Sequence, residues 1–156
     1  AAAGRSAIVR TSWVFSETGV NFVKTMLHLA GKQDEIGVVA DQLGRPTSAR
    51  SIAEACLAIA DTLTADVSAA GVYHFANRGD ARWFDVAEAV MEEARARGRR
   101  AARIRPITTA EYPTQAKRPR DSRLATGRIE RVLGREIQHW RAALGDVCQR
   151  LMPAGG

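Results

Sequence analysis

The sequence predicts one α/β domain, because short segments rich in β-branched residues alternate with longer segments of helical periodicity. The chain has 156 residues, a length that fits one domain with a core of ordinary size. Hydrophobic residues make up 46% of it and charged residues 26%, which is the balance of a soluble globular protein. The sequence contains no internal repeat, no low-complexity linker and no apolar run of about 18 residues, so neither a second domain nor a membrane span is expected.

The first third of the chain predicts a strand, a helix, a second strand and a turn. Residues 7–15 are rich in β-branched and aromatic side chains and are predicted to form a buried strand. Asn21 can cap the helix that follows, and Gly31 ends it. A short strand over 36–40 then leads into a turn at 44–46. In the helix that Asn21 can cap, the apolar positions are Phe22, Val23, Met26, Leu27 and Ala30.

The middle third predicts two helices with a strand between them. Residues 51–54 match a capping box, although the helix could begin a few residues earlier. A strand is predicted over 72–76, and a second helix over 83–97, in which Glu93 can pair with Arg97 one turn away. The expected inward positions are Ile52, Cys56, Ile59, Ala60 and Leu63 in the first helix, and Trp83, Ala87, Val90, Met91 and Ala94 in the second.

The last third contains a long irregular segment between regular elements. A strand is predicted over 103–107. Residues 108–122 carry two prolines and many polar side chains without periodicity, which is typical of a functional or disordered loop. A short helix is predicted over 127–133. The final helix is defined by a regular apolar stripe made of Trp140, Leu144, Val147, Cys148 and Leu151.

The charge and the cysteines restrict the partners and the compartment. The formal net charge of +6 suits anionic partners. The densest cationic run carries no aromatic side chain between its arginines, so we interpret it as a solvated surface rather than a nucleic-acid patch. Cys56 and Cys148 lie on predicted apolar faces and are expected to be buried thiols in a reducing compartment, which favours the cytoplasm. The arginines of the densest cationic run named above are Arg95, Arg97, Arg99, Arg100, Arg103 and Arg105.

The sequence shows none of the motifs that a complete nicotinamide-dependent reductase requires. No two glycines form the Gly-x-Gly or Gly-x-x-Gly spacing with which a helix N-terminus meets a pyrophosphate. Four residues after Tyr73 and Tyr112 stand Asn77 and Ala116, so the Tyr-x-x-x-Lys pair that would protonate a carbonyl is missing. No metal-ligand cluster is recognisable either, and the three scattered histidines are expected to be structural.

Several sequence blocks keep their order and approximate spacing over nearly the whole chain. They are Arg10-Thr11-Ser12-Trp13-Val14-Phe15, Asn21-Phe22-Val23-Lys24-Thr25-Met26, Asp41-Gln42-Leu43-Gly44-Arg45-Pro46-Thr47, Val72-Tyr73-His74-Phe75-Ala76-Asn77, Ala110-Glu111-Tyr112-Pro113-Thr114 and Lys117-Arg118-Pro119-Arg120-Asp121-Ser122-Arg123-Leu124. Together these blocks resemble the dTDP-4-dehydrorhamnose reductases, a family of extended short-chain dehydrogenases.

The resemblance implies the C-terminal part of a Rossmann-like fold. On this interpretation 1–156 is a single partial domain, with sheet strands near 7–15 and 72–76 beside a small substrate-binding region, and the cofactor-binding half would lie before Ala1. The parent enzyme would use NADPH or NADH to reduce dTDP-4-dehydro-L-rhamnose to dTDP-L-rhamnose. This chain would supply the sugar-nucleotide side, bind no cofactor alone and be inactive alone.

The resemblance also implies roles for residues of the quoted blocks. Trp13 matches a substrate-contacting tryptophan, whose indole can cover a sugar face while its N–H donates one hydrogen bond; the alternative is a core tryptophan. Thr11 and Ser12 would lie near the nicotinamide. Asn21 and Phe22 could contact the ligand at the start of the helix. Equally well, Asn21 fits a helix cap and Phe22 fits a core anchor. The other substrate-binding candidates are Gln42, Arg45 and Thr47 for the nucleotide pocket, and Lys117 and Arg118 for the diphosphate, with a solvated basic loop as the alternative for the last two.

Two positions depart from the family pattern. Phe15 stands where many members have tyrosine. Arg50 stands where some members carry a glutamate associated with a metal at a dimer interface, so no metal site is expected here and a magnesium-linked dimer is not supported. A homo-oligomer is still expected, because strands separated from the rest of their sheet would expose apolar faces and edges.

Two other function classes compete with the reductase interpretation. The first is a non-catalytic binding or regulatory protein on the same scaffold. The second is a basic nucleic-acid binder, which would show steeply salt-dependent binding to DNA without binding a sugar nucleotide. The glycine motif and the Tyr-x-x-x-Lys pair, expected upstream of this chain, would discriminate a reductase from the first alternative. We expect the partner to be a dTDP-sugar rather than nucleic acid or membrane.

Overall fold

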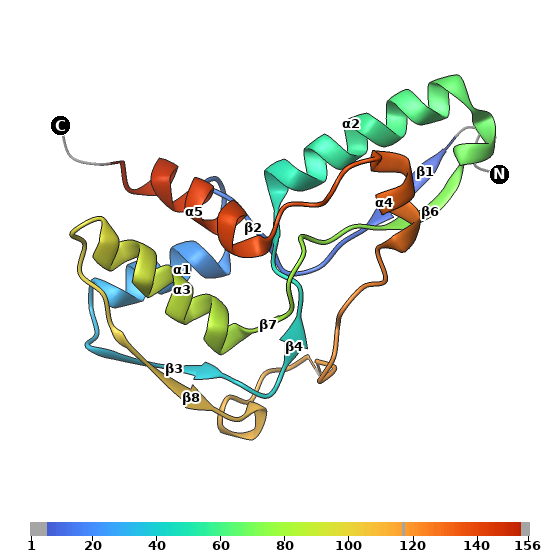
Figure 1. The fold of residues 1–156 in the computed structure, drawn as a ribbon. Helices are drawn as coiled ribbons and strands as arrows, with labels where there is room; N and C mark the ends of the chain where they lie inside the picture. The colour runs from blue at the N-terminus through green and yellow to red at the C-terminus, as the bar shows by residue number, and fades with distance from the viewer. Residues whose placement is uncertain (1–5, 117, 154–156) are drawn as a thin grey trace.

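The computed structural model describes residues 6–116 and 118–153, and these form an α/β arrangement with two hydrophobic clusters (Figure 1). The smaller cluster lies beneath a long helix at one end of the molecule. The larger cluster lies between three helices and a pair of strands at the other end. The predicted alternation of strands and helices is confirmed.

The smaller cluster is built around two parallel strands that are 60 or more residues apart in the chain. Strand β1 (Ala7–Arg10) pairs with β6 (Gly71–His74), in a register that places Ala7 opposite Gly71. Helices α2 (Ala49–Ala65) and α4 (Gly127–Leu133) pack near them, and a short 3-10 turn, η1 (Val67–Ala69), leads into β6. The buried side chains are Ala55, Ile59, Tyr73, Phe75, Ile129 and Ile137.

One face of this strand pair carries exposed apolar side chains. Ile8 is 58% exposed and Val72 is 39% exposed, whereas Tyr73, the neighbour of Val72, is buried. Successive side chains of a strand point to opposite faces, so α2 covers one face of the pair and the other stays open. The predicted exposure of apolar strand surface is confirmed.

The larger cluster combines a second parallel pair with three helices. Strand β3 (Glu35–Val39) pairs with β8 (Arg103–Ile107), so both predicted strands are confirmed. Helices α1 (Phe22–Ala30), α3 (Trp83–Ala96) and α5 (Trp140–Leu151) lie above this pair in Figure 1. Helices α1 and α3 begin at their predicted starts, and α5 contains the predicted apolar stripe. Their cluster includes the buried residues Val23, Met26, Val90, Met91, Leu144 and Cys148.

Two very short strand pairs join the clusters. Strand β2 (Val14–Phe15) runs parallel to β5 (Thr47–Ser48), and β4 (Leu43–Gly44) runs antiparallel to β7 (Ala81–Arg82). A 3-10 turn, η2 (Thr109–Glu111), follows β8. No helix in 6–116 or 118–153 is long and apolar enough to cross a membrane.

Two details of the predicted elements are wrong. The continuous strand over 7–15 is two strands, because Trp13 has a φ of 52°, which extended backbone cannot accommodate. The strand predicted over 72–76 ends at His74. Helix α2 begins before Ser51, as the sequence left open: the hydroxyl of Ser48 accepts the Ser51 N–H at 3.1 Å and is the N-cap.

The predicted apolar face of α2 is only partly confirmed: Ile59 is buried and Ile52 packs against the smaller cluster, but the predicted burial of one cysteine is wrong. The residues buried in α2 are Ala55 and Ile59, whereas Cys56 is exposed. Cys148 is buried as predicted, and burial raises the pKa of its thiol to about 12. The Ile52–Leu63 stretch is rich in alanine, so several faces of the helix are almost equally apolar and periodicity could not select one.

Two local predictions in the larger cluster are confirmed. Asn21 caps α1, because its side-chain oxygen accepts the Lys24 N–H at 3.3 Å. Glu93 and Arg97 form the predicted ion pair on α3. Gly98, which follows the helix, has a φ of 66°, a conformation that glycine adopts without steric cost.

Candidate functional site

Trp13 lies at the corner between β1 and β2, and its side chain and backbone contact three separate segments. Its ring is parallel to that of Trp83, with 3.7 Å between centroids and 6° between planes. Its Nε1–H donates to the hydroxyl of Ser122 at 3.0 Å. Its backbone carbonyl accepts the Thr47 N–H at 3.1 Å. A non-glycine residue with positive φ costs of order 1–3 kcal/mol, so the surrounding contacts must hold this conformation.

Gly44 makes this position of the indole possible. A Cβ built on Gly44 would lie 2.3 Å from Cε2 of Trp13, well inside contact distance. The neighbouring residue, Leu43, binds the segment that carries Ser122: its N–H donates to the Arg120 carbonyl at 2.7 Å, and its carbonyl accepts the Ser122 N–H at 2.9 Å. The Trp13 corner, β4 and the end of the 108–122 loop are therefore fastened together.

A hollow of about 520 Å³ opens beside this corner. It lies between helix α1, strand β3 and the loop after η2, and Trp83 forms part of its wall. Its lining is mainly apolar and aromatic, with a few polar groups, which is the usual character of a small-molecule site. The lining residues include Phe22, Met26, Ile36, Val38, Trp83, Tyr112, Gln42 and Arg118.

Three of the predicted substrate-binding residues line this hollow: Phe22, Gln42 and Arg118. Phe22 is half-buried and its ring is tilted against Trp83, with 4.7 Å between centroids. Arg118 is exposed at the rim. These residues come from α1, from the segment before β4 and from the irregular loop, so the fold brings together positions up to 96 residues apart.

Hydrogen bonds of Thr109 stabilise the polar part of the wall of this hollow. Gln42 is buried and its Nε2 donates to the Thr109 hydroxyl at 3.1 Å. That hydroxyl donates to Asp41 at 2.6 Å, and the Thr109 N–H reaches the same carboxylate at 3.0 Å. These hydrogen bonds from Thr109 lower the pKa of Asp41, so the carboxylate is charged and the Gln42 amide has a fixed orientation.

Asn21, Arg45 and Thr47 are not lining residues of the hollow. The Asn21 amide donates to the Ser16 carbonyl at 2.7 Å and caps α1. The Thr47 hydroxyl is buried and donates to the Arg45 carbonyl at 3.0 Å. The Arg45 guanidinium donates to Asp80 at 2.8 Å. Each of these polar groups therefore forms a hydrogen bond within the chain and stabilises the segments near Trp13.

The two residues predicted to lie near the nicotinamide have unmet hydrogen-bonding capacity. The hydroxyl oxygens of Thr11 and Ser12 are shielded from solvent and have no hydrogen-bond partner among the described residues. A buried hydroxyl without a partner costs about 1–3 kcal/mol. They directly precede Trp13, at the C-terminal end of β1, which is the end of a parallel strand where α/β proteins bind ligands.

Lys117, the second residue predicted to meet the diphosphate, lies outside the described residues. Trp83 and Tyr112 line the hollow but were not among the predicted ligand contacts. Trp83 was predicted only as an inward helix position, and the signal that could have singled it out is its place at the first turn of α3, directly after a strand.

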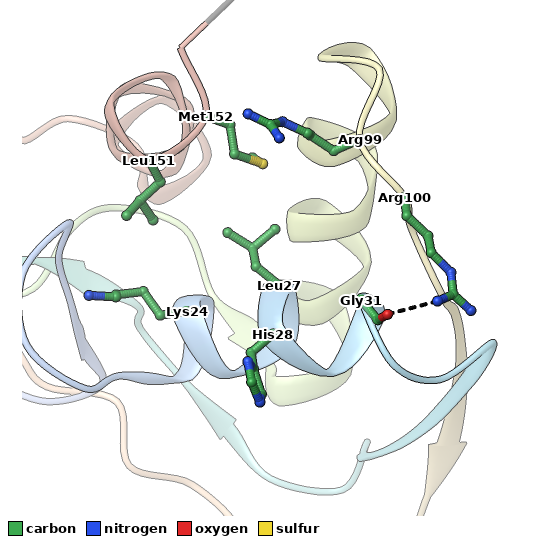
Figure 2. A pocket seen from close by; sticks show the side chains of 8 residues that line it. All are labelled: Lys24, Leu27, His28, Gly31, Arg99, Arg100, Leu151 and Met152. Atoms are coloured by element: carbon green, nitrogen blue, oxygen red, sulfur yellow. Dashed lines mark hydrogen bonds between the residues drawn. The ribbon is translucent and has the colours of Figure 1, made fainter.

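A second hollow, of about 420 Å³, lies on the other side of α1 and contains none of the predicted site residues (Figure 2). Leu27, Leu151 and Met152 line it, and Lys24, Arg99 and Arg100 stand around them. The Arg100 guanidinium donates to the Gly31 carbonyl at 2.8 Å, at the end of α1. Cations beside helix C-termini complement the helix dipole, so structure alone accounts for this cluster.

The comparisons with known proteins agree on one family. The family model described as RmlD substrate binding domain matches residues 1–152. A dTDP-4-dehydrorhamnose reductase of Sinorhizobium fredii is 44% identical over 95% of this chain and 51% of its own length. The reductase of Aggregatibacter actinomycetemcomitans is 42% identical over 92% of this chain and 50% of its own length. The chain thus spans about half the length of the curated relatives it matches.

Solved structures give the same result. A dTDP-4-dehydrorhamnose reductase from Clostridium acetobutylicum superimposes with a TM-score of 0.83 at 33% identity, over 93% of this chain and 48% of that one. The reductase from Bacillus anthracis, solved in complex with NADP, gives a TM-score of 0.76 at 31% identity, over 92% of this chain and 47% of that one.

Proposed function

This chain belongs to the RmlD substrate binding domain family, and we propose that it forms the sugar-nucleotide side of a dTDP-4-dehydrorhamnose reductase. In such an enzyme a nicotinamide cofactor supplies a hydride to the C4 ketone of dTDP-4-dehydro-L-rhamnose, and dTDP-L-rhamnose is formed. The task of the residues described above is to bind and orient the sugar nucleotide. The same proposal includes a cytoplasmic location, a dTDP-sugar as the small-molecule partner and a homo-oligomeric enzyme.

The observation that carries the proposal is the hollow beside the Trp13 corner. It combines aromatic and aliphatic walls with one oriented amide, Gln42, and one guanidinium, Arg118. A nucleoside diphosphate sugar presents the complementary groups, namely flat or apolar ring faces, carbonyl and hydroxyl groups, and a diphosphate that arginine can bind with two hydrogen bonds. Lys117 is proposed as a second cation for the diphosphate.

The remaining predicted residues have indirect roles in this proposal. Asn21, Arg45 and Thr47 would shape the wall of the site, because their polar groups are bound within the chain. Trp13, predicted as a substrate contact, would support the aromatic wall of the site at the end of β1. Since its Nε1–H is already donated to Ser122, this N–H reaches a ligand only if Ser122 moves.

The cofactor, NADPH or NADH, would be bound mainly by the half of the reductase relatives that this chain does not span. Thr11 and Ser12 fit a supporting role near the nicotinamide, because their hydroxyls have no partner among the described residues and stand at the ligand-binding end of β1. Each hydroxyl is shielded, so its side chain would have to rotate to meet the cofactor. We propose that the chain by itself binds no cofactor and reduces no substrate.

The test is calorimetric titration of the chain with dTDP-L-rhamnose. Loss of a charge-assisted hydrogen bond is worth about 1.5–3 kcal/mol, so Arg118→Ala should weaken binding roughly tenfold or more. Arg99→Ala is the matched control, because it removes an exposed arginine from the other hollow. Trp13→Ala should also weaken binding.

Two outcomes would contradict the proposal. If a folded chain binds no dTDP-L-rhamnose, this half does not contain a preformed sugar-nucleotide site. If it instead binds DNA with a steep dependence on salt concentration, the basic surface is a nucleic-acid site.

A further inference from the structure

Of the two stacked indoles, Trp83 is the one that lines the hollow, and Trp13 packs behind it. Trp83 is a lining residue of the hollow, together with Phe22 and Tyr112, whereas Trp13 is not. Trp13 lies parallel against Trp83 at 3.7 Å between ring centroids. One indole therefore borders the space for a ligand and the other supports it.

We propose that Trp83 contacts the sugar nucleotide directly and that Trp13, Gly44 and Ser122 are positioning residues that set the plane of its ring. This inference rests on the function proposed above and adds a ligand contact and three supporting residues to it. The chemistry recognised is a flat or apolar ring face, which an indole can cover.

The packing around Trp83 explains why its ring has one orientation. The Trp13 ring lies parallel to it, and the Phe22 ring is tilted against it at 53° with 4.7 Å between centroids. Trp83 is also the first residue of α3, directly after the short strand β7, so both of its backbone neighbours are in regular structure. The indole is thus set before any ligand arrives, and binding loses little side-chain entropy.

Two contacts fix Trp13 in turn. The Ser122 hydroxyl accepts its Nε1–H at 3.0 Å and can itself donate to the Leu43 carbonyl at 3.1 Å. Gly44 lies so close that an added methyl group would stand 2.3 Å from the indole. Because Ser122 follows the loop that carries Arg118, the same contacts tie the proposed diphosphate contact to the aromatic wall.

The experiment measures binding of dTDP and of dTDP-L-rhamnose to the chain and its variants. Loss of an aromatic stacking partner costs about 1–3 kcal/mol per base, so Trp83→Ala should weaken binding about fivefold or more. Weakening of both ligands would place the nucleotide against Trp83, whereas weakening of dTDP-L-rhamnose alone would place the sugar there. Either result supports the inference.

The positioning residues are tested by a spectroscopic signal as well as by affinity. The packed indoles of Trp13 and Trp83 contribute to the near-ultraviolet circular dichroism of the folded chain, and Trp13→Phe and Trp83→Phe should each change this signal. Gly44→Ala and Ser122→Ala should reduce this signal and weaken binding severalfold. Gly127→Ala is the matched control, since a Cβ there would meet only the end of the Arg131 side chain, at 3.9 Å.

The inference is overturned if Trp83→Ala folds and binds both ligands as the unaltered chain does. It is also overturned in its second part if Ser122→Ala changes the near-ultraviolet signal as much as Trp13→Phe does without changing affinity. If the unaltered, folded chain binds neither ligand, the proposed function fails and the inference fails with it. A Gly44→Ala variant that does not fold leaves Ser122→Ala to decide the positioning role.

Discussion

The buried side chain of Asn77 accepts the backbone N–H of Ser48 at 2.8 Å and so links the end of the β1·β6 pair to the start of α2. Its amide also donates to the Ser51 hydroxyl at 3.1 Å and to the Gln138 carbonyl at 3.0 Å. One fully buried amide thus holds together the N-terminus of α2, the segment after β6 and the segment before α5. Three of the four hydrogen-bonding positions of this buried amide are thus used.

Asn77→Ala should lower the free energy of unfolding by about 1–3 kcal/mol, because the substitution leaves the buried backbone N–H of Ser48 without its hydrogen-bond partner. Chemical denaturation measures the change. Gln149→Ala, on the exposed side of α5, is the control and should leave the unfolding midpoint in place. An Asn77→Ala chain as stable as the unaltered one would show that water or a local shift replaces the amide.

The Asp121–Arg123 pair predicts a loss of stability in acid. Hydrogen bonds and charge from Arg123 lower the pKa of Asp121 to about 2, and those from Arg45 and Arg123 lower the pKa of Asp80. A carboxyl whose folded pKa is below its unfolded value of 3.8 contributes stability above that value, and the contribution disappears as the pH falls toward about 2. The melting temperature should therefore fall between about pH 4 and pH 2.

Asp121→Asn should make this part of the pH profile shallower. Thermal unfolding at a series of pH values measures it, with Asp61→Asn on the exposed surface of α2 as the control. Because these carboxylates are on the surface, added salt should shrink the difference between the variants. A profile that Asp121→Asn leaves unchanged would mean that the Arg123 contacts do not persist in solution.

The open face of the β1·β6 pair predicts self-association of the chain. Ile8 and Val72 are exposed there, and β1 pairs with only one neighbour among the described strands. Ile8→Lys should shift the chain toward monomer, because a charge on an apolar strand face opposes pairing. Sedimentation at several concentrations measures this. Val20→Lys, at a position 98% exposed in a loop, is the control; a monomeric unaltered chain at all concentrations would contradict the prediction.

The sequence by itself determined most of the regular elements and the family. The α1 cap at Asn21, the strand over 103–107 and the short helix over 127–133 were all predictable, because each rests on local signals: a capping side chain, β-branched residues or a glycine stop. The blocks around Trp13, Gln42 and Arg118 pointed to the reductases, and Phe22, Gln42 and Arg118 indeed meet in one hollow.

Only the tertiary structure decided how those residues are used. Trp13 looked like a strand residue, yet contacts with Gly44, Trp83 and Ser122, up to 109 residues away, hold it at a positive φ and divide the strand. Cys56 lies on an alanine-rich helix whose buried side is selected by what packs against it. Arg45 and Thr47 sit in a family motif, but their polar groups bind the chain itself. Long-range packing overrides local preference at such positions, because a local pattern carries no information about which distant segment will supply the partner.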